Sequence, residues 1–216
     1  MELTIQEMVE KARVAMDQIK DFTQEQVDQI CYEAAKAVYK ERDPIAKMAV
    51  EETKLGKYEH KIDKLDLACS MMWEYLQDKK SVGVIAEHPE LGITEVAKPV
   101  GVVACISPAT NPGATPIANF MQAIKGKNAM IVSPAPRAKN TSERTVELIR
   151  GACVKCGAPA DLIQCVENVS IEKSGQLMAA ADLIVATGGA GMVKAAYSSG
   201  TPAYGVGPGC ECSSRA

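Results

Sequence analysis

Three loops in this chain carry groups that could hold or polarise a small ligand. The first, "SPATNPGATP", has one side-chain amide, Asn111, which could donate a hydrogen bond to a developing oxyanion. The same residue could instead form an Asx-turn before Pro112. The second loop, "SPAPRAKN", places Ser133, Arg137 and Lys139 close together, and this set suits either a ribose or phosphate or a solvated, proline-stiffened loop.

The third loop, "TGGAGMVKAA", is rich in glycine and leads into a predicted helix. Glycines allow a ligand to approach the backbone closely, and a helix N-terminus offers free N–H groups and a positive dipole end to a phosphate. The loop matches neither the G-x-G-x-x-G fingerprint nor a Walker loop. A packing role for Thr187, Gly188 and Gly191 therefore stays open beside the phosphate-binding one.

Eight cysteines raise the question of thiol or metal chemistry. Cys153 and Cys156 form a C-x-x-C pair, but they end a predicted helix, whereas a redox pair normally begins one. Cys210 and Cys212 form the second pair, and their spacing does not suit a zinc ribbon. A thiol redox or metal protein that uses these four residues remains an alternative. The other four cysteines are predicted core residues: Cys31, Cys69, Cys105 and Cys165.

The elements that must position these loops begin near residue 100. Short apolar strands alternate with amphipathic helices, and the strands are predicted at 100–107, 128–134, 161–167, 181–189 and 201–207. Continuous apolar strands between helices indicate a parallel sheet that is covered on both faces. We therefore predict a doubly wound, Rossmann-like sheet with a ligand at the carboxyl ends of its strands, where the three loops meet.

The preceding residues have two other patterns. Apolar residues recur at helical spacing over the first part of the chain, and "TQEQ" at Thr23 is a capping box that begins a helix. Two β-branched segments around "EHPELG" then indicate a β-hairpin. The predicted organisation is a helical segment at 1–80, a hairpin that serves oligomerisation at 81–99, a cofactor-binding domain at 100–209 and an atypical tail at 210–216.

Composition excludes several kinds of partner. The net charge of −3 and the aromatic content of 4% argue against a nucleic-acid binder. No apolar run approaches the length of a membrane span, about 20 residues. The start of the chain lacks the apolar core of a secretory signal, so we expect a cytoplasmic protein with reduced thiols.

Taken together, these motifs resemble the CoA-acylating aldehyde dehydrogenases, from about residue 1 to residue 209. The resemblance is carried by "FTQEQVDQI", "PVGVVACISPATNP", "NAMIVSPAPRAK", "ATGGAGMVKAAYSSG" and "GVGPG". It implies the aldehyde dehydrogenase type of α/β fold, NAD or NADP as cofactor, CoA as co-substrate and a small aldehyde or acyl-CoA as substrate. It also implies a homo-oligomer, located in the cytoplasm or in a bacterial microcompartment.

The resemblance also implies roles for single residues. Asn111 looks like the oxyanion-hole amide of the family. The implied cofactor contacts are Ser107 and Pro108 beside the nicotinamide, Ser133, Pro134 and Arg137 at the adenosine end of the dinucleotide or of CoA, and Thr187, Gly188 and Gly191 at the phosphates.

The end of the chain departs from the family pattern. The loop at 205–209 has no carboxylate where hydrolytic aldehyde dehydrogenases carry a base, which fits acyl transfer to a thiol. Cys210 stands where the family has asparagine, and the region of the catalytic cysteine does not follow. We therefore expect a truncated N-terminal portion that is catalytically incompetent alone. A stand-alone nucleotide-binding or regulatory module is the other alternative.

Overall fold

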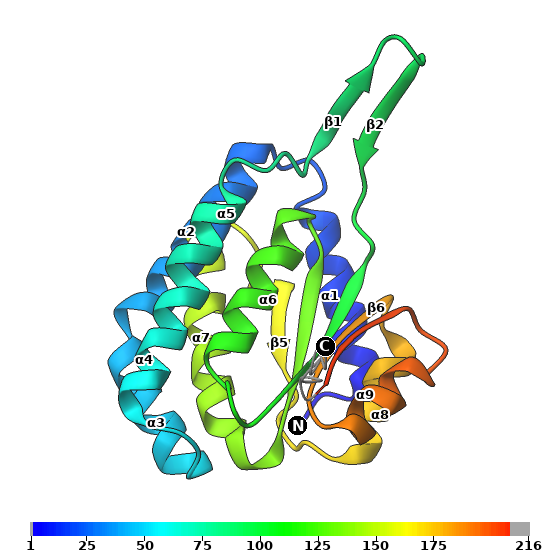
Figure 1. Ribbon diagram of the computed structural model, residues 1–216. Helices are drawn as coiled ribbons and strands as arrows, with labels where there is room; N and C mark the ends of the chain where they lie inside the picture. Colours follow the sequence, from blue (N-terminus) through cyan, green and yellow to red (C-terminus); the bar gives the residue numbers. More distant parts are fainter. Residues whose placement is uncertain (1, 208–216) are drawn as a thin grey trace, which may run out of the picture.

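The structure is a computed structural model that describes residues 2–207. Within these residues, five parallel strands form a sheet in the order β5-β4-β3-β6-β7 (Figure 1). The strands are β3 (Val102–Ser107), β4 (Ala129–Pro134), β5 (Ile163–Cys165), β6 (Leu183–Thr187) and β7 (Ala203–Val206). Each lies inside a segment predicted as a strand. The predicted doubly wound α/β fold is therefore confirmed.

Helices cover the sheet in two sets. Helices α6 (Ala114–Lys125) and α7 (Lys139–Lys155) contact each other and the strands β3 to β5. Helices α1 (Ile5–Gln18) and α8 (Ile171–Ala180) also contact each other, and α9 (Ala190–Tyr197) packs against β6 and β7. Short 3-10 turns, η2 (Pro136–Ala138) and η3 (Ala160–Leu162), enter α7 and β5. None of the helices described is long and apolar enough to cross a membrane.

The remaining N-terminal helices form an outer layer. These are α2 (Gln24–Lys40), α3 (Arg42–Thr53), α4 (Tyr58–Asp66) and α5 (Met72–Leu76), with the π-helical turn η1 (Leu67–Met71) joining α4 to α5. The capping box predicted at Thr23 is present, since Thr23 accepts from Gln26 N–H and Gln26 accepts from Thr23 N–H. A second capping box, Thr4 with Glu7, begins α1. These caps hold α1 and α2 at fixed starting points.

One hydrophobic core joins the helical layers to the sheet. It includes Ile30 and Val38 from α2, Phe120 from α6 and Ile131 from β4, all fully buried. Helix α1 packs directly on β4, and α2 packs on α6 and α7. Residues of the 1–80 segment and of the 100–209 segment thus share one core. The division into these two units remains a prediction from the sequence.

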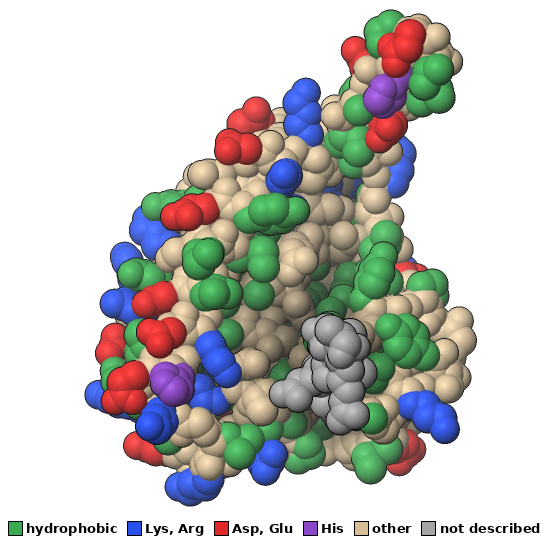
Figure 2. All heavy atoms as spheres, in the orientation of Figure 1, with side chains coloured by type: hydrophobic (Ala, Val, Ile, Leu, Met, Phe, Trp, Pro, Cys, Tyr) green, Lys and Arg blue, Asp and Glu red, His purple; other side chains and the backbone are tan. Residues whose placement is uncertain are grey.

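The hairpin of β1 (Gly83–His88) and β2 (Ile93–Ala97) is antiparallel and projects from the body of the molecule (Figure 1). It leaves at the end of the molecule opposite to the loops that follow β3 and β4. Figure 2 shows apolar side chains exposed along it, and Leu91 is 67% exposed. Within residues 2–207, the hairpin contributes no side chain to the hydrophobic core.

Candidate functional site

A cavity of about 530 Å³ lies at the carboxyl ends of four parallel strands. The register explains how it forms, because Ser107 pairs with Pro134 and Thr187 pairs with Val206 at the same edge of the sheet. The cavity lies beside β3 and β6, the neighbouring strands where the strand order reverses, which is the usual ligand position in such sheets.

The cavity brings together most of the residues predicted to bind a cofactor. Seven of them line it: Ser107, Pro108, Ser133, Pro134, Arg137, Thr187 and Gly188. Gly191 does not, since it lies in the first turn of α9, and a Cβ added there would meet open space. The roles assigned to these eight residues remain predictions.

Sequence reasoning missed the wall that α8 and the two residues before it contribute. Val169, Ser170, Ile171 and Ser174 all line the cavity. Ser170 caps α8 and follows strand β5, so its place after a strand end was a signal that could have been used. Ile171 is 90% exposed, and it lines the cavity together with Met192 of α9. Apolar side chains from two helices in the lining suit a planar, partly apolar ring.

Two hydroxyl groups in the wall differ in their partners. The Ser133 and Ser174 Oγ atoms lie 2.9 Å apart and form a buried hydrogen bond. The Ser107 Oγ atom is buried and has no hydrogen-bond partner among the described residues. A buried hydroxyl without a hydrogen-bond partner is energetically unfavourable. Ser107 is therefore a candidate for a hydrogen bond to a ligand.

Asn111 lies outside the cavity lining, in a small hollow against α3 and α4. Its neighbours there include Ile45, Lys61 and Leu65. The loop is pressed onto these helices at Gly113, where an added Cβ would come within 2.6 Å of Ile45 Cγ2. The Asn111 Oδ1 atom is buried and, among the residues described, accepts no hydrogen bond. Asn111 thus belongs to the loop whose first residues line the cavity, and its side-chain oxygen has no hydrogen-bond partner among the described residues.

Four backbone carbonyls of this loop accept hydrogen bonds from other segments or from the start of α6. Ser107 O accepts from Ala135 N at 3.0 Å, and Asn111 O accepts from Thr115 N at 3.1 Å. The Pro112 carbonyl accepts from Ser142 Oγ at 3.0 Å, and the Thr110 carbonyl accepts from Lys61 Nζ at 2.5 Å. A loop held at both its ends and its middle presents Asn111 in a fixed position, as oxyanion stabilisation requires.

The described thiols are poorly suited to nucleophilic chemistry. Burial raises the pKa of Cys31, Cys69 and Cys153 to about 12 and that of Cys105 to about 11. Burial also raises the pKa of Cys156, so the C-x-x-C pair lacks a favoured thiolate. No group of three or more potential metal ligands occurs in residues 2–207. Cys210 and Cys212 lie outside the described residues.

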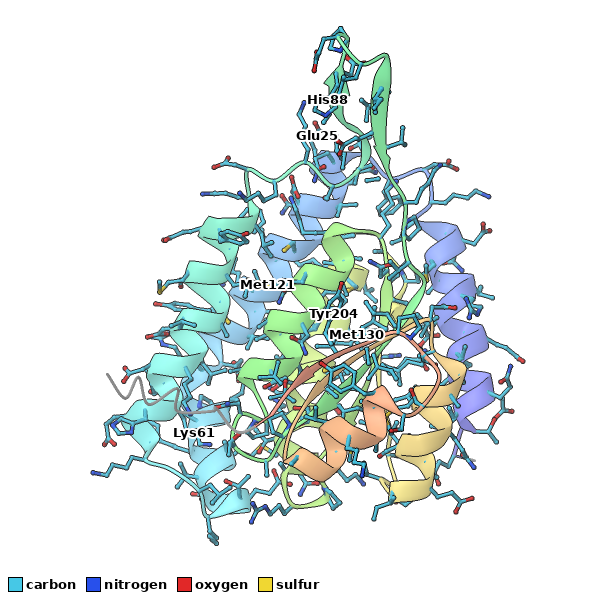
Figure 3. All side chains as sticks on the ribbon, turned by 45° about the vertical axis from the view of Figure 1, so that its right-hand side comes forward. Glu25, Lys61, His88, Met121, Met130 and Tyr204 are labelled. Atoms are coloured by element: carbon cyan, nitrogen blue, oxygen red, sulfur yellow. The ribbon has the colours of Figure 1, made fainter. Side chains whose placement is uncertain are left out.

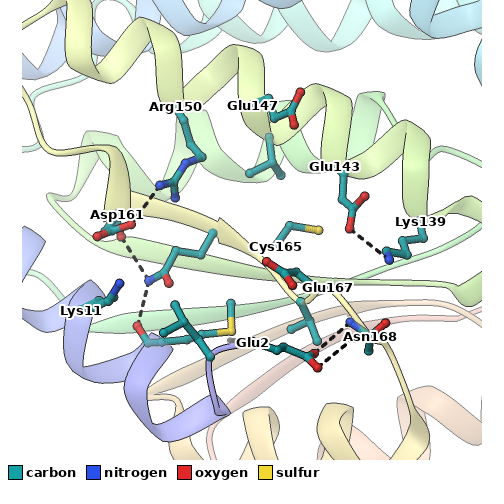
Figure 4. A pocket seen from close by; sticks show the side chains of 15 residues that line it. Glu2, Lys11, Lys139, Glu143, Glu147, Arg150, Asp161, Cys165, Glu167 and Asn168 are labelled. Carbon is teal, nitrogen blue, oxygen red and sulfur yellow. Dashed lines mark hydrogen bonds and ion pairs between the residues drawn. The ribbon is translucent and has the colours of Figure 1, made fainter.

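A second hollow, of about 570 Å³, lies at the edge strand β5 between α1 and α7 (Figure 4). Its polar groups are mostly paired with one another, as with Arg150 and Asp161 at 3.1 Å or Lys139 and Glu143 at 3.5 Å. Lys139, predicted in the same loop as Arg137, faces this hollow and does not line the cavity. Cys165, predicted as core, is only half-buried here, because β5 is an edge strand.

Known proteins are similar to this chain in sequence and in structure. The family model described as the aldehyde dehydrogenase family matches residues 2–203. The succinate-semialdehyde dehydrogenase (acetylating) of Clostridium kluyveri is 51% identical over 96% of this chain and 46% of its own length. The bifunctional aldehyde-alcohol dehydrogenase AdhE of Escherichia coli is 43% identical over 94% of this chain and 23% of its own.

Solved structures of the same family have the same fold as this chain. An acetylating aldehyde dehydrogenase from Geobacillus thermoglucosidasius superposes with a TM-score of 0.93 at 40% identity, covering 95% of this chain and 46% of that one. The chain thus spans less than half the length of the relatives it matches. The resemblance to acylating aldehyde dehydrogenases is confirmed, and this chain belongs to the aldehyde dehydrogenase family.

Proposed function

We propose that this chain is the cofactor-binding portion of a CoA-acylating aldehyde dehydrogenase and that the 530 Å³ cavity binds NAD or NADP. The observation that carries the proposal is the cavity itself, which unites three strand-end loops with the start of α9. The N–H groups of the first turn of a helix have no partner within the helix, and they suit the phosphates of a dinucleotide.

The described residues fit such a ligand in shape and polarity. Ile171 and Met192 offer apolar contacts for the adenine, and the buried Ser107 hydroxyl, which has no partner among the described residues, could bond a polar group of the ligand. Arg137 is exposed at the rim and forms no ion pair within the described part of the chain. Its guanidinium would bind a phosphate of NADP or of CoA.

Solved structures of relatives support a nicotinamide cofactor and a CoA substrate. An engineered glycolyl-CoA reductase, 30% identical to this chain, has been solved with bound NADP+. The propionaldehyde dehydrogenase of Rhodopseudomonas palustris, also 30% identical, has been solved with bound propionyl-CoA. When bound, a nicotinamide would supply the hydride acceptor and CoA would supply the thiol that takes the acyl group, once a nucleophile has added to the aldehyde carbon.

Asn111 would act beside the cofactor. Its carboxamide would donate a hydrogen bond to the oxygen of a small aldehyde as negative charge develops there. The held carbonyls of its loop fix its position before the substrate arrives. No cysteine lines the cavity or the hollow around Asn111 in the part of the chain described. We therefore expect the chain alone to bind cofactor without forming NADH from an aldehyde and CoA.

The binding proposal can be tested by filling the cavity. Gly189 precedes α9 with extended backbone, lines the cavity, and would place a Cβ in open space. Gly189→Phe should therefore fold and weaken NAD binding by at least about tenfold, or about 1.4 kcal/mol. Isothermal titration calorimetry with NAD measures this directly. Gly175→Phe is the matched control, because Gly175 also has open space but does not line the cavity.

Equal affinity in the parent chain and in Gly189→Phe would place the dinucleotide elsewhere. An affinity lost equally in both variants would point to a general effect of the added ring. Aldehyde- and CoA-dependent formation of NADH by the purified chain would contradict the expected inactivity. In that case, replacing each cysteine in turn would identify the nucleophile.

We also infer that the chain associates with copies of itself through the hairpin. Val84, Leu91, Ile93 and Val96 are each about half exposed or more on β1, β2 and their turn. Exposed apolar side chains that lie together on a projecting element favour association. Light scattering over a range of dilutions should show a dimer or larger species.

We further propose that the protein is located in the cytoplasm or in a bacterial microcompartment. Two structural relatives come from a microcompartment of Clostridium phytofermentans.

A further inference from the structure

Two lysines in the structure are buried, and their partners differ. Lys125 is 3% exposed, and its Nζ lies 2.5 Å from Asp28 Oδ1, so its charge is paired. Lys61 is 6% exposed, and its Nζ donates to the Thr110 carbonyl, with no ion pair to any carboxylate in residues 2–207. A buried ammonium without a counter-charge is unfavourable for folding. Lys61 therefore needs an explanation that core packing does not supply.

The surroundings of Lys61 deepen the contrast. The hollow beside it is lined by Lys57, His60, Lys64 and one acid, Asp63, and on its other side Ile45 and Leu65 are apolar. Burial lowers the pKa of the Lys61 ammonium, and the positive charge of Lys64 lowers it further. Figure 3 shows Lys61 on α4, at the end of the molecule opposite to His88 of the hairpin.

The residue that Lys61 holds is the one directly before Asn111. The bond spans 49 residues of sequence and joins α4 to the middle of the loop after β3. The flanking carbonyls of Ser107, Asn111 and Pro112 are fixed by neutral donors, so Lys61 supplies the single charged anchor of this loop among the described residues. Charge-assisted hydrogen bonds are shorter and stronger than neutral ones.

We propose that Lys61 is a positioning residue that fixes the Thr110 carbonyl and thereby the orientation of Asn111. The inference rests on the proposed role of Asn111 as the oxyanion donor. The lysine does not touch substrate or cofactor in this assignment. It sets the peptide plane from which the Asn111 side chain emerges, and its buried charge makes that setting stronger than a neutral hydrogen bond would.

The sequence permits a direct test, because Thr-Asn occurs only once, at residues 110–111. The full chain labelled with 13C′-threonine and 15N-asparagine gives a single carbon–nitrogen correlation, which reports the bonded carbonyl. We expect Lys61→Met to move this peak and to average the Asn111 side-chain amide signals. Lys64→Met, one turn away on the same hollow and exposed, should leave the peak in place.

A pH titration of the parent chain tests the same point without a variant. The Thr110 carbonyl signal should titrate with a midpoint below 10.5, the ordinary value for lysine, because burial and Lys64 both disfavour the ammonium. In Lys64→Met the midpoint should rise, and in Lys61→Met the titration should vanish. Lys61→Arg should restore the parent peak position in part.

Three results would overturn the proposal. These are an unmoved peak in folded Lys61→Met, a parent carbonyl that does not titrate, and inorganic phosphate that shifts the Lys61 Nζ signal while releasing the Thr110 carbonyl. The last would make Lys61 an anion site. Dinucleotide binding is measured separately by calorimetry on the parent chain, so failure of the cofactor proposal remains distinguishable from failure of this one.

Discussion

The two ends of the parallel sheet differ in whether their buried polar groups have hydrogen-bond partners. At the amino end, Asn128 Oδ1 accepts from the N–H groups of Val100 and Gly101, and Asp182 Oδ2 accepts from Val102 N at 2.7 Å. At the carboxyl end, Ser107 at the end of β3 keeps a buried hydroxyl with no partner among the described residues. At the amino end of β3, side chains from the segments before β4 and β6 pair the backbone N–H groups, whereas at the carboxyl end the Ser107 hydroxyl has no partner among the described residues.

This difference follows from how the chain is used at each end. At the amino end, the residues entering a strand need only stability, so short polar side chains satisfy the backbone groups that the ladder leaves free. At the carboxyl end, the loops diverge to opposite faces of the sheet and leave a crevice. Unpaired polar groups at this end lower the free energy of unfolding, and a ligand that supplied the missing partner would recover it.

We call the amino end of the sheet the closed end and the carboxyl end the open end. The largest expected loss of stability comes from a substitution at Gly101, in the closed end. Its φ is +127°, and an added Cβ would clash with the Asp182 carboxylate. Gly101→Ala should therefore combine backbone strain with overpacking and lower the free energy of unfolding by about 3 kcal/mol or more. Denaturant unfolding followed by circular dichroism measures the loss.

Gly92→Ala is the matched control for strain alone. Its φ is +65° in the hairpin turn, and nothing lies within 4 Å of the added Cβ. It should destabilise the chain by only about 1 kcal/mol. If Gly101→Ala and Gly92→Ala had equal effects, the close packing of Asp182 against β3 would be disproved.

A somewhat smaller effect is expected at Asn128, which is 8% exposed. Its side chain accepts from two backbone N–H groups and donates to Ala123 O at 3.0 Å. Asn128→Ala leaves all three groups without this partner and should cost about 2 kcal/mol. Asn140→Ala on α7, where the asparagine is exposed, should stay within about 0.5 kcal/mol. A result reversed between these two would refute the closing role.

The sequence predicted the sheet better than it predicted the site. Strand positions follow from local apolar runs, and all five strands lie inside the predicted segments. The three loops meet as expected because parallel strands share one carboxyl edge. The contribution of Ile171 and Ser174 from α8 depends on how that helix packs, and no short-range pattern encodes it.

Asn111 shows the same limit. Its loop was predicted to reach the ligand edge, but Gly113 packs against Ile45 and brings the loop onto α3 and α4. The partner that holds the loop, Lys61, lies 49 residues earlier, on a helix whose apolar pattern gives no sign of it. Contacts between distant segments determine the details of the site, whereas local periodicity determines the fold.

The next prediction concerns pH at the closed end. Partial burial by itself raises the pKa of the Asp182 carboxyl, but hydrogen bonds from Arg13 and Val102 N–H outweigh it, so the net shift is downward. Its contribution to stability is therefore present above the unfolded pKa, about 3.9, and is lost as pH falls through the lower folded value.

Asp182→Asn tests this sign. At neutral pH the variant should be less stable by about 1 kcal/mol, since the ion pair with Arg13 at 2.9 Å is partly exposed. Melting temperatures measured from pH 7 down to pH 3 should show the two proteins converging in acid. A gap that stays constant over this range would mean that the Asp182 charge plays no part. Arg13→Ala should reproduce the same convergence.

The smallest effect, with the opposite sign, is expected at the open end. Ser107 is 2% exposed and its Oγ has no partner in the described residues, so Ser107→Ala should leave stability unchanged or raise it by up to about 1 kcal/mol. Ser142→Ala is the matched control, because the buried Ser142 Oγ donates to Pro112 O at 3.0 Å and its loss should cost about 1 kcal/mol.

Adding NAD sharpens the comparison between Ser107→Ala and the parent. If the ligand uses the Ser107 hydroxyl, the rise in melting temperature that NAD produces should be smaller in Ser107→Ala than in the parent. A Ser107→Ala protein that is less stable than Ser142→Ala would show that the hydroxyl is already paired, and the open end would then be as closed as the other.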